Sequence, residues 1–229
     1  MAERDSHVMS AIAGRIAECF FSIQGEGVTA GLPAIFIRLQ GCSVGCHWCD
    51  TKYSWDPAEG REQTLEALLE EVATFPCSRV VVTGGEPLES PLFAPLVEVL
   101  KTRHYAVEVE TSGTLPPPSV PVDQWNVSLK LANSRVPEAT RINPKAIRDF
   151  LDRDAWWKFV VADRGDIGEV RQLMQRFTLP RDRILLMPEG IHAAEILERS
   201  TWVVEECRHH GFRYSPRLHV LLWGAKRGV

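Results

Sequence analysis

The sequence lacks any apolar run that approaches the roughly 20 residues of a membrane-spanning helix. Its first ten residues also lack the apolar stretch of a signal peptide, because they carry Glu3, Arg4, Asp5 and His7. We therefore expect a protein that stays in the reducing cytoplasm and has no membrane contact. In that compartment its six cysteines are expected to be thiols or metal ligands rather than disulfides.

A strong excess of one charge is also missing, as are internal repeats and low-complexity tracts. The 229 residues include 26 basic and 30 acidic side chains, a formal net charge of −4, which argues against bulk binding to nucleic acid or to anionic membranes. An apolar content of 45% is ordinary for a globular protein and excludes a disordered or collagen-like chain. A chain this long can bury enough surface to fold without a metal, so we expect any bound metal to serve function.

Six short apolar runs predict buried strands, and amphipathic segments between several of them predict helices. The predicted strands are Ala34–Gln40, Arg79–Thr83, Tyr105–Glu110, Trp125–Lys130, Trp156–Val161 and Ile184–Met187. The predicted helices are Thr64–Phe75, with Thr64 as its N-cap, Pro91–Arg103, Ile167–Phe177 and His192–His209. The proline-rich segment from Leu115 to Pro121 predicts a rigid loop rather than a domain linker.

This alternation predicts an α/β fold with a parallel sheet built from βαβ units. An eight-unit barrel takes about 250 residues, whereas only six strands are predicted here. We therefore expect an incomplete, trimmed (β/α)6 barrel, with residues 15–229 as a single domain and residues 1–14 as an N-terminal extension. In such folds the chemistry lies at the carboxyl ends of the strands.

The strongest signal is a loop with three cysteines directly after the first predicted strand. Cys42, Cys46 and Cys49 are spaced C-x3-C-x2-C, so one loop can aim three thiolates at a common point. Three thiolates can hold three irons of a cubane cluster and leave the fourth iron open to a small molecule. The alternative is zinc with His47 as the fourth ligand, although His47 lies very close in sequence to two of the cysteines. The other cysteines are isolated and are predicted to be ordinary thiols: Cys19, Cys77 and Cys207.

The cysteine loop resembles the signature of the radical S-adenosylmethionine (SAM) superfamily, and Gly84-Gly85-Glu86-Pro87 resembles the GGEP motif of that superfamily. The resemblance implies a trimmed barrel of the radical SAM type, a [4Fe–4S] cluster on Cys42, Cys46 and Cys49, and SAM on the open iron. Leu129 stands where many members have proline. The SAM contacts that the resemblance implies lie in the cluster loop and at the strand ends: Trp48, Cys49, Asp50, Gly84, Gly85, Glu86, Glu110, Ser112, Ser128, Leu129, Lys130, Met187 and Glu189.

Three further segments resemble the 7-carboxy-7-deazaguanine synthase family: Ile23-Gln24-Gly25-Glu26-Gly27, Cys49-Asp50-Thr51, and the stretch from Leu218 to Val229. Members convert 6-carboxy-5,6,7,8-tetrahydropterin to 7-carboxy-7-deazaguanine with loss of ammonia, on the route to queuosine and other 7-deazapurines. They regenerate SAM and require Mg²⁺. The resemblance implies Mg²⁺ at Thr51 and substrate contacts at Ile23, Gln24, Gly25, Glu26, Arg38, Thr83 and His219.

The chemistry of these side chains suits that substrate. The amide of Gln24 can donate and accept, and the carboxylate of Glu26 can accept two N–H groups from a pterin edge. Arg38 offers a fork that matches a carboxylate, and Thr51 offers the hard oxygen that Mg²⁺ prefers. Each residue also has a plain structural reading, such as a turn, an ion pair within a strand or a core histidine, so the joint pattern carries the prediction.

Two other functions stay open from the sequence. A glycyl-radical activase has the same cysteine spacing but acts on a protein, and a non-catalytic iron–sulfur or zinc module has no reaction at all. Metal analysis distinguishes the enzyme from the module, because about four irons per chain favour the enzyme and one zinc favours the module. For the enzyme, we expect an electron donor of the flavodoxin or ferredoxin type and, from the family resemblance, a homodimer.

Overall fold

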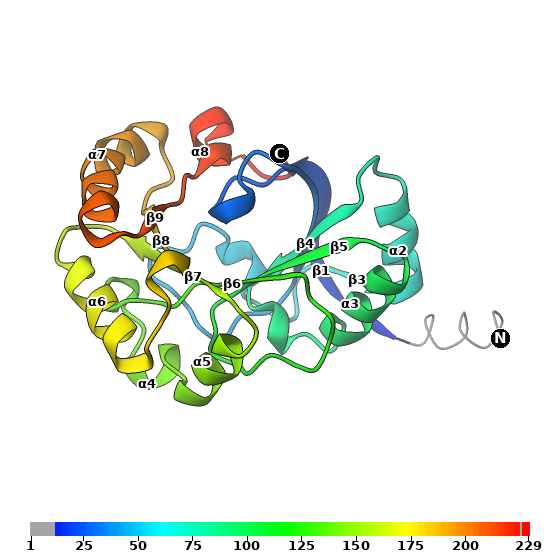
Figure 1. Ribbon diagram of the computed structural model, residues 1–229. Coiled ribbons are helices and arrows are strands. Elements are labelled where there is room, and N and C mark those ends of the chain that lie inside the picture. Colours follow the sequence, from blue (N-terminus) through cyan, green and yellow to red (C-terminus); the bar gives the residue numbers. More distant parts are fainter. Residues whose placement is uncertain (1–11, 225) are drawn as a thin grey trace.

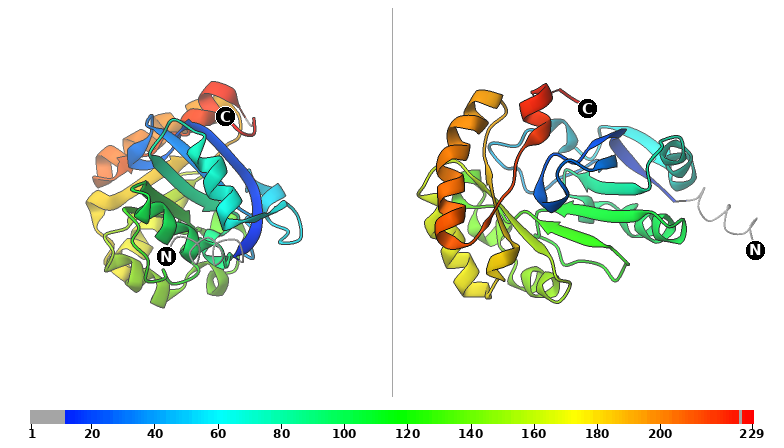
Figure 2. Two further views of the ribbon diagram at one scale, coloured as in Figure 1. Left: turned by 90° about the vertical axis from the view of Figure 1, so that its right-hand side faces the viewer. Right: turned by 45° about the horizontal axis from the view of Figure 1, so that its top comes forward.

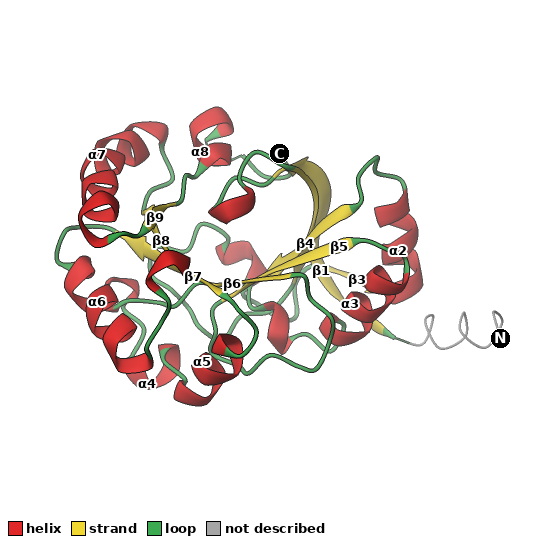
Figure 3. Cartoon of the chain, viewed as in Figure 1, coloured by secondary structure: helices red, strands yellow, loops and turns green. Residues whose placement is uncertain are grey.

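The computed structural model describes residues 12–224 and 226–229, in which one curved sheet has its helices on the outer side (Figures 1 and 3). The strands follow the order β3-β1-β2-β4-β5-β6-β7-β8-β9 across the sheet. Their bounds are β1 (Ala13–Ile23), β2 (Pro33–Leu39), β3 (Arg61–Thr64), β4 (Arg79–Gly84), β5 (Ala106–Thr111), β6 (Gln124–Val127), β7 (Trp156–Val161), β8 (Ile184–Pro188) and β9 (Arg213–Tyr214).

The six predicted strands are confirmed as β2 and β4 to β8, which pair in parallel. The predicted end of the strand Trp125–Lys130 was wrong, because β6 ends at Val127 and Ser128 to Lys130 form a loop instead. The sequence did not predict the antiparallel β1 and β3 at one edge or the two-residue β9 at the other. The predicted plan of a trimmed parallel barrel is therefore correct, with three additional strands at the two sides of the sheet.

The four predicted helices are present, and the structure adds shorter ones. The helices are α2 (Leu65–Ala73), α3 (Phe93–Thr102), α4 (Glu138–Arg141), α5 (Pro144–Leu151), α6 (Asp166–Phe177), α7 (Ala193–His210) and α8 (Leu218–Trp223). Thr64 caps α2 as predicted, since its hydroxyl accepts a hydrogen bond from the Ala67 N–H at 3.2 Å. The proline-rich segment contains no helix between residues 112 and 123, which agrees with the predicted loop.

The side chains of the parallel strands alternate between two environments, because successive residues of a strand point to opposite faces. On β5, Val107 and Val109 belong to the hydrophobic core, whereas Glu108 and Glu110 point to the inner face. On β7, Trp157 and Phe159 flank Lys158 in the same way. The outer face thus packs against the helices, and the inner face carries polar groups.

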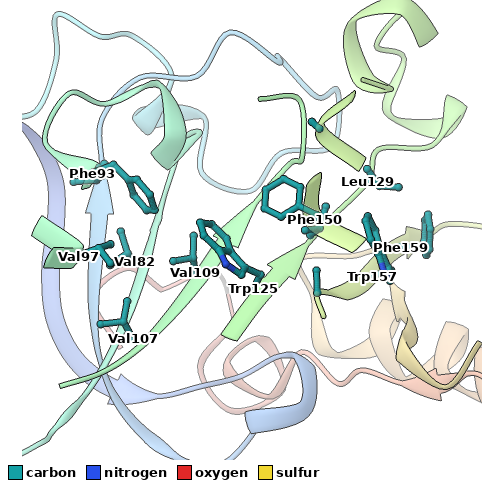
Figure 4. Packing of buried hydrophobic residues seen from close by; sticks show 14 of the residues in the cluster. Val82, Phe93, Val97, Val107, Val109, Trp125, Leu129, Phe150, Trp157 and Phe159 are labelled. Carbon is teal, nitrogen blue, oxygen red and sulfur yellow. The ribbon is translucent and has the colours of Figure 1, made fainter. Parts of the chain in front are cut away.

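The core between the sheet and the helices is closely packed (Figure 4). The ring of Trp125 on β6 lies 5.3 Å from that of Phe150 on α5 and 6.1 Å from that of Phe93 on α3, measured between centroids. Trp157 and Phe150 are fully buried. This layer fixes the strands, and thereby their carboxyl ends, relative to one another.

The segment that follows β1 meets the start of α8. The Leu218 N–H at the start of α8 donates to the carbonyl of Gly25, just after β1, at 2.9 Å. Figure 2 shows α8 above the hollow of the sheet, next to the segment that follows β1. β1 begins at Ala13, and residues 1–11 lie outside the described part, so the domain boundary at residue 14 stays a prediction. No helix in residues 12–224 and 226–229 is long and apolar enough to cross a membrane.

Candidate active site

A cavity of about 280 Å³ opens at the carboxyl ends of the strands, where the sequence predicts the chemistry. It brings together most of the predicted site residues: Ile23, Gln24, Glu26, Arg38, Cys42, Cys46, Trp48, Cys49, Asp50, Thr51, Thr83, Gly84, Gly85, Glu110, Ser112, Ser128, Lys130, Met187, Glu189 and His219. Three predicted residues do not line it: Gly25, Glu86 and Leu129. Leu129 instead belongs to the hydrophobic core.

The cysteine loop is held against the Gly84-Gly85-Glu86 segment by backbone hydrogen bonds. The Gly85 N–H donates to the Leu39 carbonyl at 3.1 Å, and the Glu86 N–H donates to the Gly41 carbonyl at 2.8 Å. A Cβ atom at Gly85 would lie 2.3 Å from the Gly41 oxygen and 2.6 Å from the Cβ of Cys42. Gly85 therefore has no side chain because the cluster loop occupies that space.

The three thiols of the loop lie in an apolar setting. Cys42, Cys46 and Cys49 pack with Val44 and Trp48, and Cys46 is buried. Burial raises the pKa of Cys42 to about 11 and also raises that of Cys46. Both groups are therefore thiols at neutral pH without a metal, and iron binding has to displace their protons.

The geometry favours a cluster over a single zinc ion. Among the residues that the structure describes, no three His, Cys, Asp or Glu side chains are placed to hold one metal ion. His47, the proposed fourth zinc ligand, is exposed, and its backbone N–H donates to the Ser134 carbonyl. A cubane spreads three thiolates over three irons, whereas zinc needs four ligands around one atom. The donor set thus fits a [4Fe–4S] cluster.

The predicted SAM residues of the cluster loop and of the loop after β6 contact one another. Lys130 Nζ lies 5.7 Å from the centroid of the Trp48 ring and donates to the Ser128 hydroxyl at 2.9 Å. The Trp48 indole N–H donates to Asn133 Oδ1 at 3.1 Å. These contacts orient a flat aromatic surface and an ammonium group along one wall of the cavity.

Glu86 is a buried hydrogen-bond acceptor that does not line the cavity. Its carboxylate is 1% exposed and accepts hydrogen bonds from the Thr111 hydroxyl at 2.7 Å, the Ser112 N–H at 2.7 Å and the Leu88 N–H at 3.1 Å. It therefore ties the end of β4 to the end of β5. Whether it also contacts SAM stays a prediction.

The floor of the cavity is a buried polar network around β5. Gln24 Nε2 donates to Glu108 Oε1 at 2.8 Å, and Gln24 Oε1 accepts from the Glu26 N–H at 3.2 Å. Asn126 Nδ2 donates to Glu108 at 2.7 Å and to Glu110 at 2.9 Å. The Gln24 amide is consequently held in one orientation by groups on both sides.

Glu26 lies among three basic side chains. Its Oε2 is 2.6 Å from Lys158 Nζ, and its Oε1 is 3.4 Å from Arg217 Nε and 3.9 Å from His219 Nε2. Burial would raise the pKa of Glu26, but Lys158, Arg217 and His219 outweigh burial and hold the pKa well below its usual range. Burial lowers the pKa of His219, so this imidazole is neutral at pH 7.

Arg217 joins three segments of the site. Its guanidinium pairs with Asp50 in the cluster loop and with Glu26 after β1, and it donates to the Gly190 carbonyl after β8. The same residue is buried. Arg217 thus links the predicted cluster and SAM residues to the predicted substrate residues.

Arg38 keeps one donor without a protein acceptor. Its Nε lies 3.5 Å from Glu18 Oε1 but has no hydrogen-bond partner within residues 12–224 and 226–229, while Nη1 donates to the Gly84 carbonyl at 3.3 Å. Glu18 also pairs with the Tyr53 hydroxyl and, at 3.5 Å, with Arg227. The Arg227 guanidinium lies 3.6 Å from the centroid of the Tyr53 ring.

Several residues that line the cavity have no role predicted from the sequence, chiefly Glu18, Tyr53, Lys158, Arg217 and Arg227. One signal for Lys158 was available, because it alternates with the core residues Trp157 and Phe159 and must therefore face inward. Arg217 has no such signal, since it precedes the short helix α8, which was not predicted.

Comparisons with known proteins agree with this site. The family model of the radical SAM superfamily matches residues 36–153. The 7-carboxy-7-deazaguanine synthase of Pyrobaculum aerophilum is 40% identical over 220 residues, which cover 93% of this chain and 96% of that protein. The enzyme of the same name from Escherichia coli K12 is 31% identical over 227 residues, covering 90% and 97%. The crystal structure of QueE from Escherichia coli superposes with a TM-score of 0.75 at 30% identity, covering 94% of this chain and 99% of that one.

Proposed function

The chain belongs to the 7-carboxy-7-deazaguanine synthase family of the radical SAM superfamily, and from this membership we propose that it converts 6-carboxy-5,6,7,8-tetrahydropterin to 7-carboxy-7-deazaguanine with loss of ammonia. The reaction is that of a carbon–nitrogen lyase in queuosine and 7-deazapurine biosynthesis. The supporting observation is that the cysteine loop, the strand-end residues and the predicted pterin residues line one cavity.

The cofactors follow from the superfamily and fit the residues present. Cys42, Cys46 and Cys49 would hold a [4Fe–4S] cluster, and the neighbouring strand ends would hold SAM. When bound, these cofactors supply the radical that takes hydrogen from the substrate carbon bearing the carboxylate. The protein's own contribution is to position the substrate and to exclude water.

The substrate contacts that we propose use side chains with fixed orientations. Glu26, held as a carboxylate by its basic neighbours, accepts N–H groups of the pterin edge, beside the oriented amide of Gln24. Arg38, which lines the cavity, offers its guanidinium to the substrate carboxylate. His219 and Thr83 complete the enclosure, and Gly25 is small because a Cβ there would lie 2.2 Å from His219 Nδ1.

The magnesium site is also a proposal. Thr51 follows the cluster loop, and its hydroxyl lies 3.5 Å from Cys49 Sγ, on the wall of the cavity. A hydroxyl oxygen is a ligand that Mg²⁺ accepts, and substrate oxygens would complete much of its shell. Removal of Mg²⁺ with a chelator, and separately Thr51→Ala, should lower turnover while SAM binding persists. Equal activity with and without Mg²⁺ would contradict the site.

Three further expectations concern the cellular setting. We propose that the enzyme acts in the cytoplasm, receives its electron from a flavodoxin or ferredoxin, and forms a homodimer. Size-exclusion chromatography with light scattering checks the last of these, and a mass of one chain would contradict it.

The decisive experiment is an anaerobic assay with cluster-reconstituted protein, SAM, Mg²⁺, a reductant and 6-carboxytetrahydropterin. We expect a product lighter than the substrate by one ammonia, detected by mass spectrometry, with SAM largely intact. Deoxyadenosine without that product would support radical SAM chemistry on another substrate, such as the protein substrate of an activase. A verified cluster with neither signal would favour a non-catalytic binding module.

A pair of variants distinguishes the residues that would hold the cluster from those that would hold the substrate. Cys42→Ala should abolish SAM cleavage, because the cluster loses an iron ligand. Arg38→Ala should lower substrate turnover by roughly tenfold or more while some uncoupled SAM cleavage persists, because a charge-assisted contact is worth about 1.5–3 kcal/mol. If both variants lose only substrate binding, this division of roles is wrong.

A further inference from the structure

Lys158 is a buried cation in the middle of the site. It projects from the centre of β7 into the cavity, and its side chain is 5% exposed. Its Nζ lies 2.6 Å from Oε2 of Glu26 and 2.6 Å from Oε2 of Glu110. One ammonium group therefore connects the segment after β1 with the end of β5, across 132 and 48 positions of the sequence.

The charged and titratable groups around this bridge come from every neighbouring element. They are Glu108 on β5, Arg79 on β4 at 3.7 Å from Glu108, Arg217 and His219 beside Glu26, and Asp50, which pairs with Arg217. Burial already raises the pKa of Glu110 to about 7 with Lys158 in place. Without Lys158, the carboxylates of Glu26 and Glu110 would be buried close together with one cation fewer. Repulsion between two buried carboxylates raises the pKa of the pair, so the pair would take up a proton.

The shared ammonium also fixes geometry. Each carboxylate keeps one oxygen on Lys158, and the second oxygen of Glu110 accepts from Asn126 at 2.9 Å. The carboxylate plane of Glu26 is thereby set by Lys158 on one oxygen and by Arg217 on the other. A 2-amino-4-oxopyrimidine ring presents a ring N–H next to an amino N–H, and only an ionised carboxylate accepts both at once.

We propose that Lys158 is a positioning residue, whose single ammonium group holds Glu26 and Glu110 so that Glu26 meets the N–H edge of a 2-amino-4-oxopyrimidine as an ionised acceptor. This inference rests on the proposed function, in which Glu26 contacts the pterin. Lys158 itself acts through the two carboxylates and needs no contact with the ligand.

The test is the affinity of the cluster-reconstituted, SAM-bound protein for 6-carboxypterin, a fluorescent analogue with the same edge, between pH 5.5 and pH 7.5. Lys158→Met should weaken binding at least tenfold more at pH 5.5 than at pH 7.5, relative to the unchanged protein, because a competing proton costs up to about tenfold per pH unit. A merely structural role would weaken binding by the same factor at every pH. That constant factor, or wild-type affinity, would overturn the inference.

Three further variants complete the design. Lys158→Met combined with Glu110→Gln removes the excess buried charge, so its binding should lose the added pH dependence; a pH dependence equal to that of Lys158→Met would contradict the proposal. Lys158→Arg keeps the cation and should show the pH profile of the unchanged protein.

Lys145→Met, on α5 with a side chain 70% exposed, is the control for the lysine-to-methionine change and should bind normally.

The double variant and Lys158→Arg carry the test if Lys158→Met does not fold. Failure of the unchanged protein to bind 6-carboxypterin would overturn the proposed function together with this inference. Normal binding and turnover by the unchanged protein, with a pH-independent effect of Lys158→Met, would overturn the inference alone.

Discussion

Gly85 shows how closely the two SAM-related motifs pack. A methyl group there would lie 2.3 Å from the Gly41 oxygen, so Gly85→Ala should displace the cluster loop. We expect the iron content after reconstitution to fall well below the about four atoms per chain of a cubane. Gly168→Ala is the matched control, because no atom lies within 4 Å of a Cβ atom at this position of α6. It should keep the cluster and stabilise the chain by about 0.4–1 kcal/mol. Full iron content in Gly85→Ala would contradict this account.

His219 makes stability depend on pH. Burial lowers the pKa of its imidazole in the folded chain, despite the opposing attraction of Glu26. The unfolded chain therefore takes up the proton first, so the contribution of His219 to stability is present above its ordinary pKa of about 6.5 and is lost as the pH falls through the lower folded value. Thermal melts from pH 7.5 to pH 5 should show a shallower fall of Tm for His219→Gln than for the unchanged protein. Identical slopes would show that His219 plays no part.

At the scale of elements, α5 is held to the sheet by an aromatic contact. Phe150 is fully buried against Trp125 of β6, with ring centroids 5.3 Å apart. Phe150→Ala should cost about 3–5 kcal/mol. That cost corresponds to a fall in Tm of roughly 6–20 °C for a chain of this size. The control is Leu197→Ala on α7, whose side chain is 59% exposed and whose loss should change stability by less than about 0.5 kcal/mol. A shift below about 2 °C in Phe150→Ala would contradict the packing seen here.

The sequence predicts the strands that are buried on both faces and the helices that have a capping residue or an amphipathic pattern of their own. The six parallel strands appear as apolar runs, and Thr64 begins its helix as expected because its hydroxyl caps the first turn. β1 escapes prediction because most of its residues are half-buried and show no apolar run. The helix α5 is eight residues long, and its start signals, the Asn143 cap and Pro144, come directly after the short helix α4.

The same distinction applies to the site. The cysteine loop spans eight residues and is visible in the sequence as a motif. The contacts between Lys158 and Glu26, 132 residues apart, and between Arg217 and Asp50, 167 residues apart, depend on how the sheet closes. Arg38 illustrates the intermediate case, because its type suggests a carboxylate ligand while its pairing with Glu18 emerges only in three dimensions.

At the scale of the whole molecule, ligands should stabilise the fold because the cavity is lined from both ends of the described chain. A ligand at 100 times its Kd adds about 2.7 kcal/mol to the free energy of unfolding. That gain raises Tm by roughly 5–10 °C at this chain length. We expect such a shift with SAM for the reconstituted protein and none for Cys42→Ala. Equal shifts for both proteins would place SAM away from the cluster loop.

The closure of the cavity by segments from both ends has a consequence for biosynthesis. Cys42, Cys46 and Cys49 leave the ribosome long before Arg217 and His219 are made, since the chain is built from its amino terminus. The cysteine loop is therefore complete while the opposite wall of the cavity does not yet exist. On the proposed function, the residues that would hold the cluster are made well before the last of those that would hold the pterin.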